Sequence, residues 1–216
     1  MTEKMKSTII WTVVVAGVIG MVALLAIFGN SGSGGVGHLT RELSVSEHLE
    51  GNFGAPLQLV EYSDFQCPAC GDTYPLIKRL VQDLPDELVF AYRHFPLRQI
   101  HSNANRAAEA AEAAGKQGKF WEMHDMLFNT QEQWSTMDDP SDFFVKLANS
   151  IGLEENKFVN DLNSADVADK VDNDYNEATA LELQGTPSFY LNGEYLETPG
   201  TYDGFKSLLE QHLSTL

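Results

Sequence analysis

The chain has 216 residues, and its 31 acidic and 14 basic side chains give a formal net charge of −17. Phosphate binding needs a basic surface, so this balance argues against a nucleic-acid partner. The hydrophobic fraction of 43% supports a sizeable core, and the length fits one domain with additional segments.

An apolar stretch without charged residues covers residues 7–28 and is long enough to span a bilayer. Lys4 and Lys6 precede it, and no basic residue follows before Arg41, so the positive-inside rule predicts that residues 1–6 are cytoplasmic and the remainder lies outside. We expect a retained single-pass anchor in the cell membrane. A cleaved signal peptide is the alternative, although its apolar region is usually shorter and ends at an A-x-A-like site. Both interpretations place the cysteines in the periplasm or at the cell exterior, where disulfides persist.

A flexible linker is predicted for residues 29–44, because residues 29–37 are Gly, Ser and Asn with a single Val. The folded domain is then expected over residues 45–216. Within it, the apolar run at residues 57–62 predicts a buried strand.

The only two cysteines, Cys67 and Cys70, follow this strand at the start of a helical pattern. A thiol at a helix N-terminus faces unpaired backbone N–H groups and the positive end of the helix dipole, and both favour the thiolate. Cys67 is expected to be that thiol. Cys70, one turn later on the same face, can reach the Cys67 sulfur and close a disulfide. This setting is typical of a thioredoxin-type redox site.

Two other interpretations of the cysteines are inert thiols in a core and half of a zinc site. Zinc needs two further ligands. The chain has no other cysteine, and its six histidines lack paired spacing. We therefore expect a redox-active disulfide, with neither a metal nor a cofactor.

The predicted strand at residues 57–62 contains one acidic residue, Glu61. A carboxylate among apolar residues is costly unless it is functional or paired. Glu61 is either a buried proton acceptor, linked to Cys70 through water, or a residue at the end of a sheet that faces solvent. The residues by themselves support both interpretations equally.

The rest of the chain alternates between helical and extended patterns. Pro75 lies inside the helix after the cysteines and is expected to kink it. Ser102 is a possible helix cap. Pro187 opens a strand, and Asn192-Gly193 predicts a type I′ turn after it. The predicted elements are a helix over 74–84, a strand over 88–94, helices over 103–114, 120–128, 140–151, 154–162 and 165–183, strands over 185–191 and 194–196, and a helix from 201.

This order of elements resembles an α/β thioredoxin fold with a helical insertion at about residues 100–165. It is similar to the membrane-anchored DsbA-like thiol–disulfide oxidoreductases over about residues 45–214. The features that carry the resemblance are Cys67-Pro68-Ala69-Cys70, Glu61 in the position of the family's buried acid, Pro75 five residues after Cys70, and Thr186-Pro187 in the position of the cis-proline loop. The resemblance implies that the catalytic residues are Cys67, Cys70 and Glu61. It implies that the substrate is contacted by Thr186, Pro187, Pro68, Ala69 and Phe65.

The resemblance also implies an enzyme that introduces disulfides into reduced exported proteins and is reoxidised by a DsbB-like integral-membrane partner. Residues 37–55 are too short for a dimerisation domain of the DsbC type, and we expect a monomer. The direction of electron flow stays open. Ala69 stands where the best-known periplasmic DsbA enzymes have histidine, and Thr186 is shared with isomerase and reductase branches. The alternatives are a membrane-tethered reductase or isomerase, or a thioredoxin-fold module that binds a metal or a substrate without turnover.

Overall fold

The computed structural model describes residues 37–215. The predicted cytoplasmic tail at residues 1–6, the predicted anchor at residues 7–28 and most of the linker lie outside these residues. Among the helices of residues 37–215, none is both long and apolar enough to cross a membrane.

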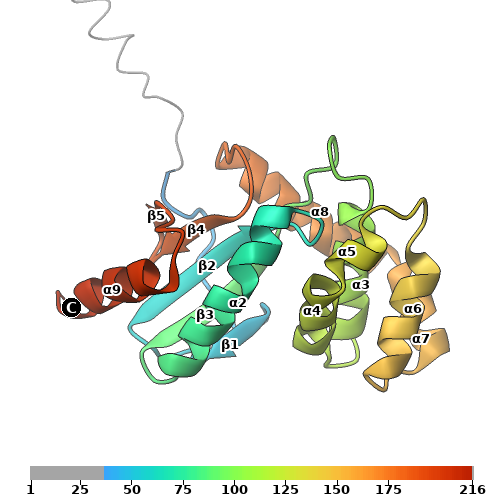
Figure 1. Ribbon diagram of the computed structural model, residues 1–216, viewed down its shortest axis with the longest axis horizontal. Coiled ribbons are helices and arrows are strands. Elements are labelled where there is room, and N and C mark those ends of the chain that lie inside the picture. The colour runs from blue at the N-terminus through green and yellow to red at the C-terminus, as the bar shows by residue number, and fades with distance from the viewer. Residues whose placement is uncertain (1–36, 216) are drawn as a thin grey trace, which may run out of the picture. The chain divides into compact units, whose positions relative to one another are not determined.

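Five strands form one sheet in the order β1-β3-β2-β4-β5 (Figure 1). The central strand β2 pairs in parallel with β3 and antiparallel with β4, and the two edge strands also pair antiparallel. The strands are β1 (Leu49–Gly51), β2 (Leu57–Ser63), β3 (Leu88–His94), β4 (Ser188–Leu191) and β5 (Glu194–Leu196). The predicted strands are confirmed, although the one predicted over 185–191 begins at Ser188. The short edge strand β1 begins in residues 38–50, a segment without a strong period that could hold a short strand.

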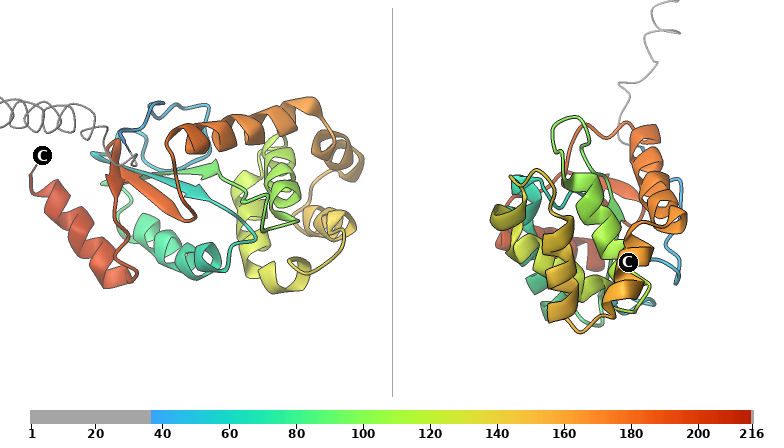
Figure 2. Two further views of the ribbon diagram at one scale, coloured as in Figure 1. Left: turned by 90° about the horizontal axis from the view of Figure 1, so that it is seen from above. Right: turned by 90° about the vertical axis from the view of Figure 1, so that its right-hand side faces the viewer.

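Helices cover both faces of the sheet. Figure 2 shows α2 (Pro68–Asp83) and α9 (Tyr202–Leu213) on one face and α8 (Ala165–Ala180) on the other. Side chains alternate between the two faces along a strand. Thus Leu57 and Leu59 of β2 belong to the core beneath α2 and α9, whereas Val60 and Tyr62 pack in the core beneath α8. Glu61 has the parity of Leu59 and therefore lies on the α2 face.

A block of helices lies between β3 and α8 along the chain and forms the predicted insertion (Figures 1 and 2). Alanines on the buried side of its first helix allow close approach of the neighbouring helices. Trp134, fully buried, stacks edge-on against Phe144 and holds the short α5 to this block. Its helices are α3 (Ala104–Gly115), α4 (Phe120–Asn129), α5 (Gln131–Trp134), α6 (Ser141–Ser150) and α7 (Glu155–Leu162).

Several helix boundaries differ from the predictions. The helix α2 begins at Pro68 and continues through Pro75, so the proline does not divide it. Asn103, not Ser102, is the N-cap residue of α3. The helix predicted to reach residue 183 ends at Ala180, because Glu182 adopts a positive φ of 56° that no α-helix accommodates. The type I′ turn after β4 is confirmed by positive φ angles at both of its central residues.

Candidate active site

The two cysteines lie at the carboxyl end of β2, where the chain turns into α2. Cys67 is the N-cap residue of α2, with extended backbone angles, and Pro68 occupies the first turn. A proline there is compatible with the helix because the first N–H groups have no helical partner. The sulfur of Cys67 therefore lies at the positive end of the helix, as the sequence predicts.

The two thiols are unbonded in this structure and differ sharply in their surroundings. Cys67 is 8% exposed, and its Sγ lies 3.5 Å from the carbonyl oxygen of Thr186, whereas Cys70 is fully buried. The Cys70 thiol lowers the pKa of Cys67 to about 5, with further help from Thr186 and from the first N–H groups of α2 and against the effect of burial. Cys67 is thus the more exposed sulfur of the pair and the one whose pKa is lowered.

The pKa of Cys70 is shifted in the opposite direction. Burial raises it well above its ordinary value, and the neighbouring Cys67 and Glu61 add to the effect. An attacking or leaving thiolate at Cys70 therefore needs a nearby group that can take or give its proton.

Glu61 is a buried acid that can meet this requirement. Its side chain is 2% exposed, and its Oε1 has no hydrogen-bond partner among residues 37–215. Burial raises the pKa of Glu61 to about 7, with a smaller contribution from Cys67 and an opposing one from Ser63. The structure thus selects the buried interpretation of Glu61 over the sheet-end alternative.

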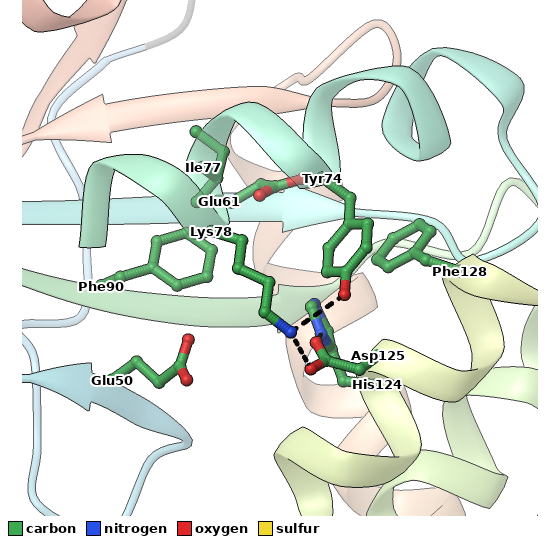
Figure 3. Close-up of a pocket in the computed structure, with 9 residues that line it drawn as sticks. All are labelled: Glu50, Glu61, Tyr74, Ile77, Lys78, Phe90, His124, Asp125 and Phe128. Atoms are coloured by element: carbon green, nitrogen blue, oxygen red, sulfur yellow. Dashed lines mark hydrogen bonds and ion pairs between the residues drawn. The ribbon is translucent and has the colours of Figure 1, made fainter. Parts of the chain in front are cut away.

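A small cavity borders Glu61 on the α2 side (Figure 3). Its volume of about 10 Å³ is close to the space that one water molecule needs. Lys78 lies at its other end, where the ammonium group pairs with Asp125 and donates to the Tyr74 hydroxyl. The cavity therefore leads from the buried carboxyl group towards polar side chains of α2 and α4.

The predicted substrate contacts fall into two groups. Thr186 and Pro187, joined by a cis peptide bond, lie beside Cys67 and are partly exposed, and Pro68 and Ala69 are exposed next to it. Phe65 is different: its ring is 1% exposed and stacks on Tyr92 at a centroid distance of 5.0 Å. The apolar ring of Phe65 therefore packs beneath the loop and is not presented at the surface beside Cys67.

Two residues that sequence reasoning missed support the loop. The carboxylate of Asp64, buried after β2, accepts from the N–H of Gln66 at 2.7 Å, from the N–H of Leu97 at 2.8 Å, and contacts His101 Nδ1 at 2.7 Å. Gln131 of α5 donates to two carbonyl oxygens of the same loop. An acid directly after a buried strand was a signal for Asp64, but nothing local marks Gln131.

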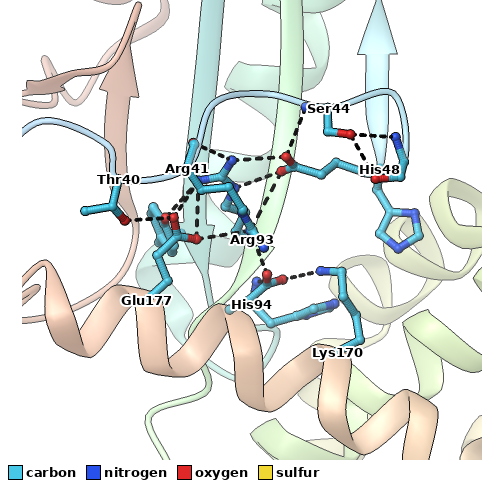
Figure 4. A network of polar contacts seen from close by, with 12 residues as sticks. Thr40, Arg41, Ser44, His48, Arg93, His94, Lys170 and Glu177 are labelled. Atoms are coloured by element: carbon cyan, nitrogen blue, oxygen red, sulfur yellow. Dashed lines mark hydrogen bonds and ion pairs between the residues drawn. The ribbon is translucent and has the colours of Figure 1, made fainter.

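A second polar cluster stabilises the carboxyl ends of β2 and β3 from the α8 side (Figure 4). The guanidinium group of Arg93, fully buried, pairs with Glu47 at 2.8 Å and with Glu177 at 3.2 Å. It also donates to the Tyr62 hydroxyl at 3.0 Å. These contacts tie residues 38–48 to the sheet and to α8.

Within residues 37–215, no three His, Cys, Asp or Glu side chains gather in a way that could hold a metal ion. The arrangement around Cys67 is suited to thiol–disulfide exchange, since it joins a thiol with a lowered pKa to a fully buried partner thiol and a buried acid with a raised pKa.

A family model described as thioredoxin matches residues 43–211. Among solved structures, oxidised BdbD from Bacillus subtilis is similar with a TM-score of 0.70 and 22% identity, over 82% of this chain and 99% of that one. α-DsbA1 from Wolbachia pipientis has a TM-score of 0.69 and 19% identity, over 78% and 92% of the two chains. The catalytic domain of Proteus mirabilis ScsC has a TM-score of 0.66 and 22% identity, over 82% and 93%.

Curated relatives are similar over part of their length only. The Na⁺/H⁺ antiporter NhaA 3 of Salinispora tropica is 37% identical over 147 residues, which are 68% of this chain and 22% of the antiporter. NhaA 1 of Mycolicibacterium vanbaalenii is 38% identical over 151 residues, or 68% and 23%. The chain thus spans less than a quarter of the length of these relatives. By the family match and the structural likeness together, the chain belongs to the thioredoxin family and has the fold of the DsbA-like thiol–disulfide oxidoreductases.

Proposed function

We propose that the protein is a thiol–disulfide oxidoreductase that acts as a dithiol oxidase on exported polypeptides. The observation that carries this proposal is the opposite shift of the two thiol pKa values, to about 5 at Cys67 and well above the ordinary value at Cys70. A low pKa of the accessible thiol stabilises the reduced enzyme as a thiolate. A stabilised reduced form makes the disulfide a stronger oxidant.

The reaction runs in two exchanges. A substrate thiolate attacks Sγ of Cys67 in the Cys67–Cys70 disulfide, a mixed disulfide forms, and Cys70 leaves. A second substrate thiolate then attacks the substrate sulfur of the mixed disulfide, and Cys67 leaves as a thiolate. The substrate dithiol loses two electrons, which the cysteine pair now holds. The low pKa of Cys67 makes it the better leaving group in the second step.

In this scheme, Glu61 exchanges a proton with Cys70. The departing Cys70 takes a proton from the buried carboxyl group, and the carboxylate takes it back when the pair is reoxidised. A pKa of about 7 suits both directions at neutral pH. The adjoining cavity has room for a water that carries the proton.

Thr186 and Pro187 are proposed to present their backbone to the substrate chain, which adds alongside as an extended strand. The exposed Pro68 and Ala69 form the other wall beside Cys67. The distance of 3.5 Å from Cys67 Sγ to the carbonyl oxygen of Thr186 favours this position of the substrate chain, because a substrate sulfur bonded to Cys67 would lie next to that backbone.

The proposed location is supported by the sequence, and the proposed partners are supported by the resemblance to the DsbA-like family. The apolar residues 7–28 support a membrane anchor with the domain outside the cytoplasm. Reduced exported proteins are the proposed substrates, and a DsbB-like membrane protein is the proposed acceptor of the electrons. The protein is proposed to act as a monomer that needs neither a metal nor a cofactor.

The reduction potential of the cysteine pair tests the direction of electron flow. Equilibration of the purified domain with glutathione is expected to give a potential nearer to about −120 mV than to about −270 mV. A value near the lower figure would instead support the reductase or isomerase alternative, which the alanine at position 69 favours because no histidine there donates to the Cys67 thiolate. The absence of any exchange with glutathione would point to a binding module without turnover.

A further inference from the structure

One amide side chain of the helical insertion contacts the backbone on both sides of the catalytic loop. Nε2 of Gln131 donates to the carbonyl oxygen of Phe65 at 2.6 Å and to that of Cys67 at 2.9 Å. Each of its two N–H groups therefore has an acceptor. The opposite orientation of the amide would place its oxygen against two carbonyl oxygens, so the contacts fix how the side chain lies.

A second amide side chain, that of Gln66 in the catalytic loop, contacts the insertion. Nε2 of Gln66 donates to the carbonyl oxygen of Ser135 at 2.7 Å, and its oxygen accepts from the N–H of Asn103 at 2.7 Å. The loop and the insertion are thus joined by hydrogen bonds in both directions. The buried Trp134 in turn holds α5 in the insertion, so Gln131 is presented from a fixed base.

The first turn of α2 leaves space for this amide. A Cβ atom at Gly71 would lie 2.8 Å from Oε1 of Gln131, which is closer than such atoms approach. A side chain at position 71 would therefore require the amide group of Gln131 to shift.

We propose that Gln131 is a positioning residue, which holds Cys67 in the N-cap geometry of α2 so that its sulfur faces the first N–H groups of the helix and the carbonyl of Thr186. The inference rests on the function proposed above. The carbonyl of Cys67 accepts from the N–H of Gly71 at 3.1 Å as well as from Gln131. Loss of the Gln131 amide leaves the Cys67 carbonyl held by Gly71 alone and removes this donor from the Phe65 carbonyl, so the backbone that carries the sulfur is less firmly aligned with the helix.

The test compares Gln131→Ala with Gln133→Ala. Gln133 lies two residues away on α5, is exposed, and its side chain makes no hydrogen bond within the part of the chain that the structure describes. The pKa of Cys67 is measured from the ultraviolet absorbance of its thiolate, and the redox equilibrium is measured against glutathione. Gln131→Ala is expected to raise the Cys67 pKa by about one unit and to shift the equilibrium about tenfold towards the disulfide. Gln133→Ala is expected to leave both unchanged.

Gly71→Ala reaches the same contact from the other side. In the wild-type background it is expected to raise the Cys67 pKa as Gln131→Ala does. In the Gln131→Ala background it is expected to add nothing, because the displaced amide is already absent. This non-additivity is what a shared contact produces. It also keeps the inference testable if Gln131→Ala fails to fold.

Two results would separate the inference from the proposed function. A wild-type Cys67 with an ordinary thiol pKa and no exchange with glutathione would contradict the proposed function itself. A wild type that behaves as proposed, with folded Gln131→Ala and Gly71→Ala variants that keep its Cys67 pKa and redox equilibrium, would overturn the positioning role of Gln131 alone.

Discussion

The sulfur of Cys67 and the carbonyl oxygen of Thr186 lie 3.5 Å apart although 119 positions separate the two residues along the chain. Strand pairing brings them together: β2 and β4 run antiparallel with Tyr62 opposite Ser188, so the end of one strand meets the start of the other. The residue proposed to react and the backbone proposed to hold the substrate are therefore placed together by the register of β2 and β4.

Alkylation of the reduced protein is expected to depend on pH through Cys67 alone. Because the Cys67 pKa is about 5 and the Cys70 pKa lies well above its ordinary value, modification by iodoacetamide should stop at one thiol and rise with a midpoint near pH 5. Mass spectrometry after timed quenching locates the modified thiol. The Cys67→Ser variant is the control and should not react at neutral pH. Modification of Cys70 at a comparable rate would contradict the assignment of roles.

Replacement of the buried acid is expected to slow the resolving step. In Glu61→Gln, no carboxylate accepts the Cys70 proton, so the rate of disulfide closure after reaction with oxidised glutathione should fall about 10²-fold. The wild-type rate should rise with pH through about 7, and the variant should lose this rise. Stopped-flow fluorescence follows the closure, and mass spectrometry should detect the mixed disulfide on Cys67 accumulating in the variant. An unchanged rate and pH profile would exclude Glu61 from proton transfer.

The same substitution is expected to stabilise the fold at alkaline pH. The folded pKa of Glu61, about 7, exceeds the value of 4.5 that applies to an unperturbed glutamate, so the folded state binds more protons than the unfolded state between these values. The contribution of Glu61 to stability is full below pH 4.5 and is lost as the pH rises through 7. Glu61→Gln removes this loss. Urea unfolding should therefore show that the free energy of unfolding of the variant minus that of the wild type is larger at pH 8 than at pH 4, by up to about 3 kcal/mol. A gain that is equal at both pH values would contradict the raised pKa.

Loss of the buried guanidinium group is expected to destabilise the domain strongly. In Arg93→Met, the carboxylates of Glu47 and Glu177 lose a buried cation, and breaking such a pair costs about 3–5 kcal/mol. Urea unfolding measures the free energy, and limited proteolysis should show earlier cleavage within residues 38–48. Arg98→Ala is the control: its ion pair with Asp172 is largely exposed and should change stability by less than about 1 kcal/mol. Similar losses in the two variants would show that the network contributes little.

The parts of the fold that the sequence predicted are those with strong local signals. The strands β2 and β3 are buried on both faces, so their residues form continuous apolar runs that periodicity recognises. Asn192 and Gly193 are residue types that readily adopt the positive φ angles that a type I′ hairpin turn requires. The cis bond before Pro187 was expected from the resemblance to the DsbA-like family, and the structure confirms it.

The parts that were missed depend on contacts between distant segments. The three-residue β1 has little signal of its own and is defined by pairing with β3. Burial decides between the two interpretations of Glu61, and burial requires α2 to be in place above the strand. The resemblance implies a substrate contact for Phe65, whereas in the folded domain its ring is buried against Tyr92 of β3. Gln131 lies 64 positions from Cys67, and only the folded insertion brings its amide to the loop.

The single carboxylate of Asp64 joins the cysteine loop to the segment after β3, because it accepts from Gln66 and Leu97 at the same time. Two neighbouring loops are therefore ordered during folding and not at the moment of encounter. An unfolded polypeptide loses much conformational entropy when it binds, and a partner that must order its own loops adds to that loss. Loops that are already fixed add no ordering cost of their own, so the entropy lost on binding the proposed polypeptide substrate comes mainly from that polypeptide.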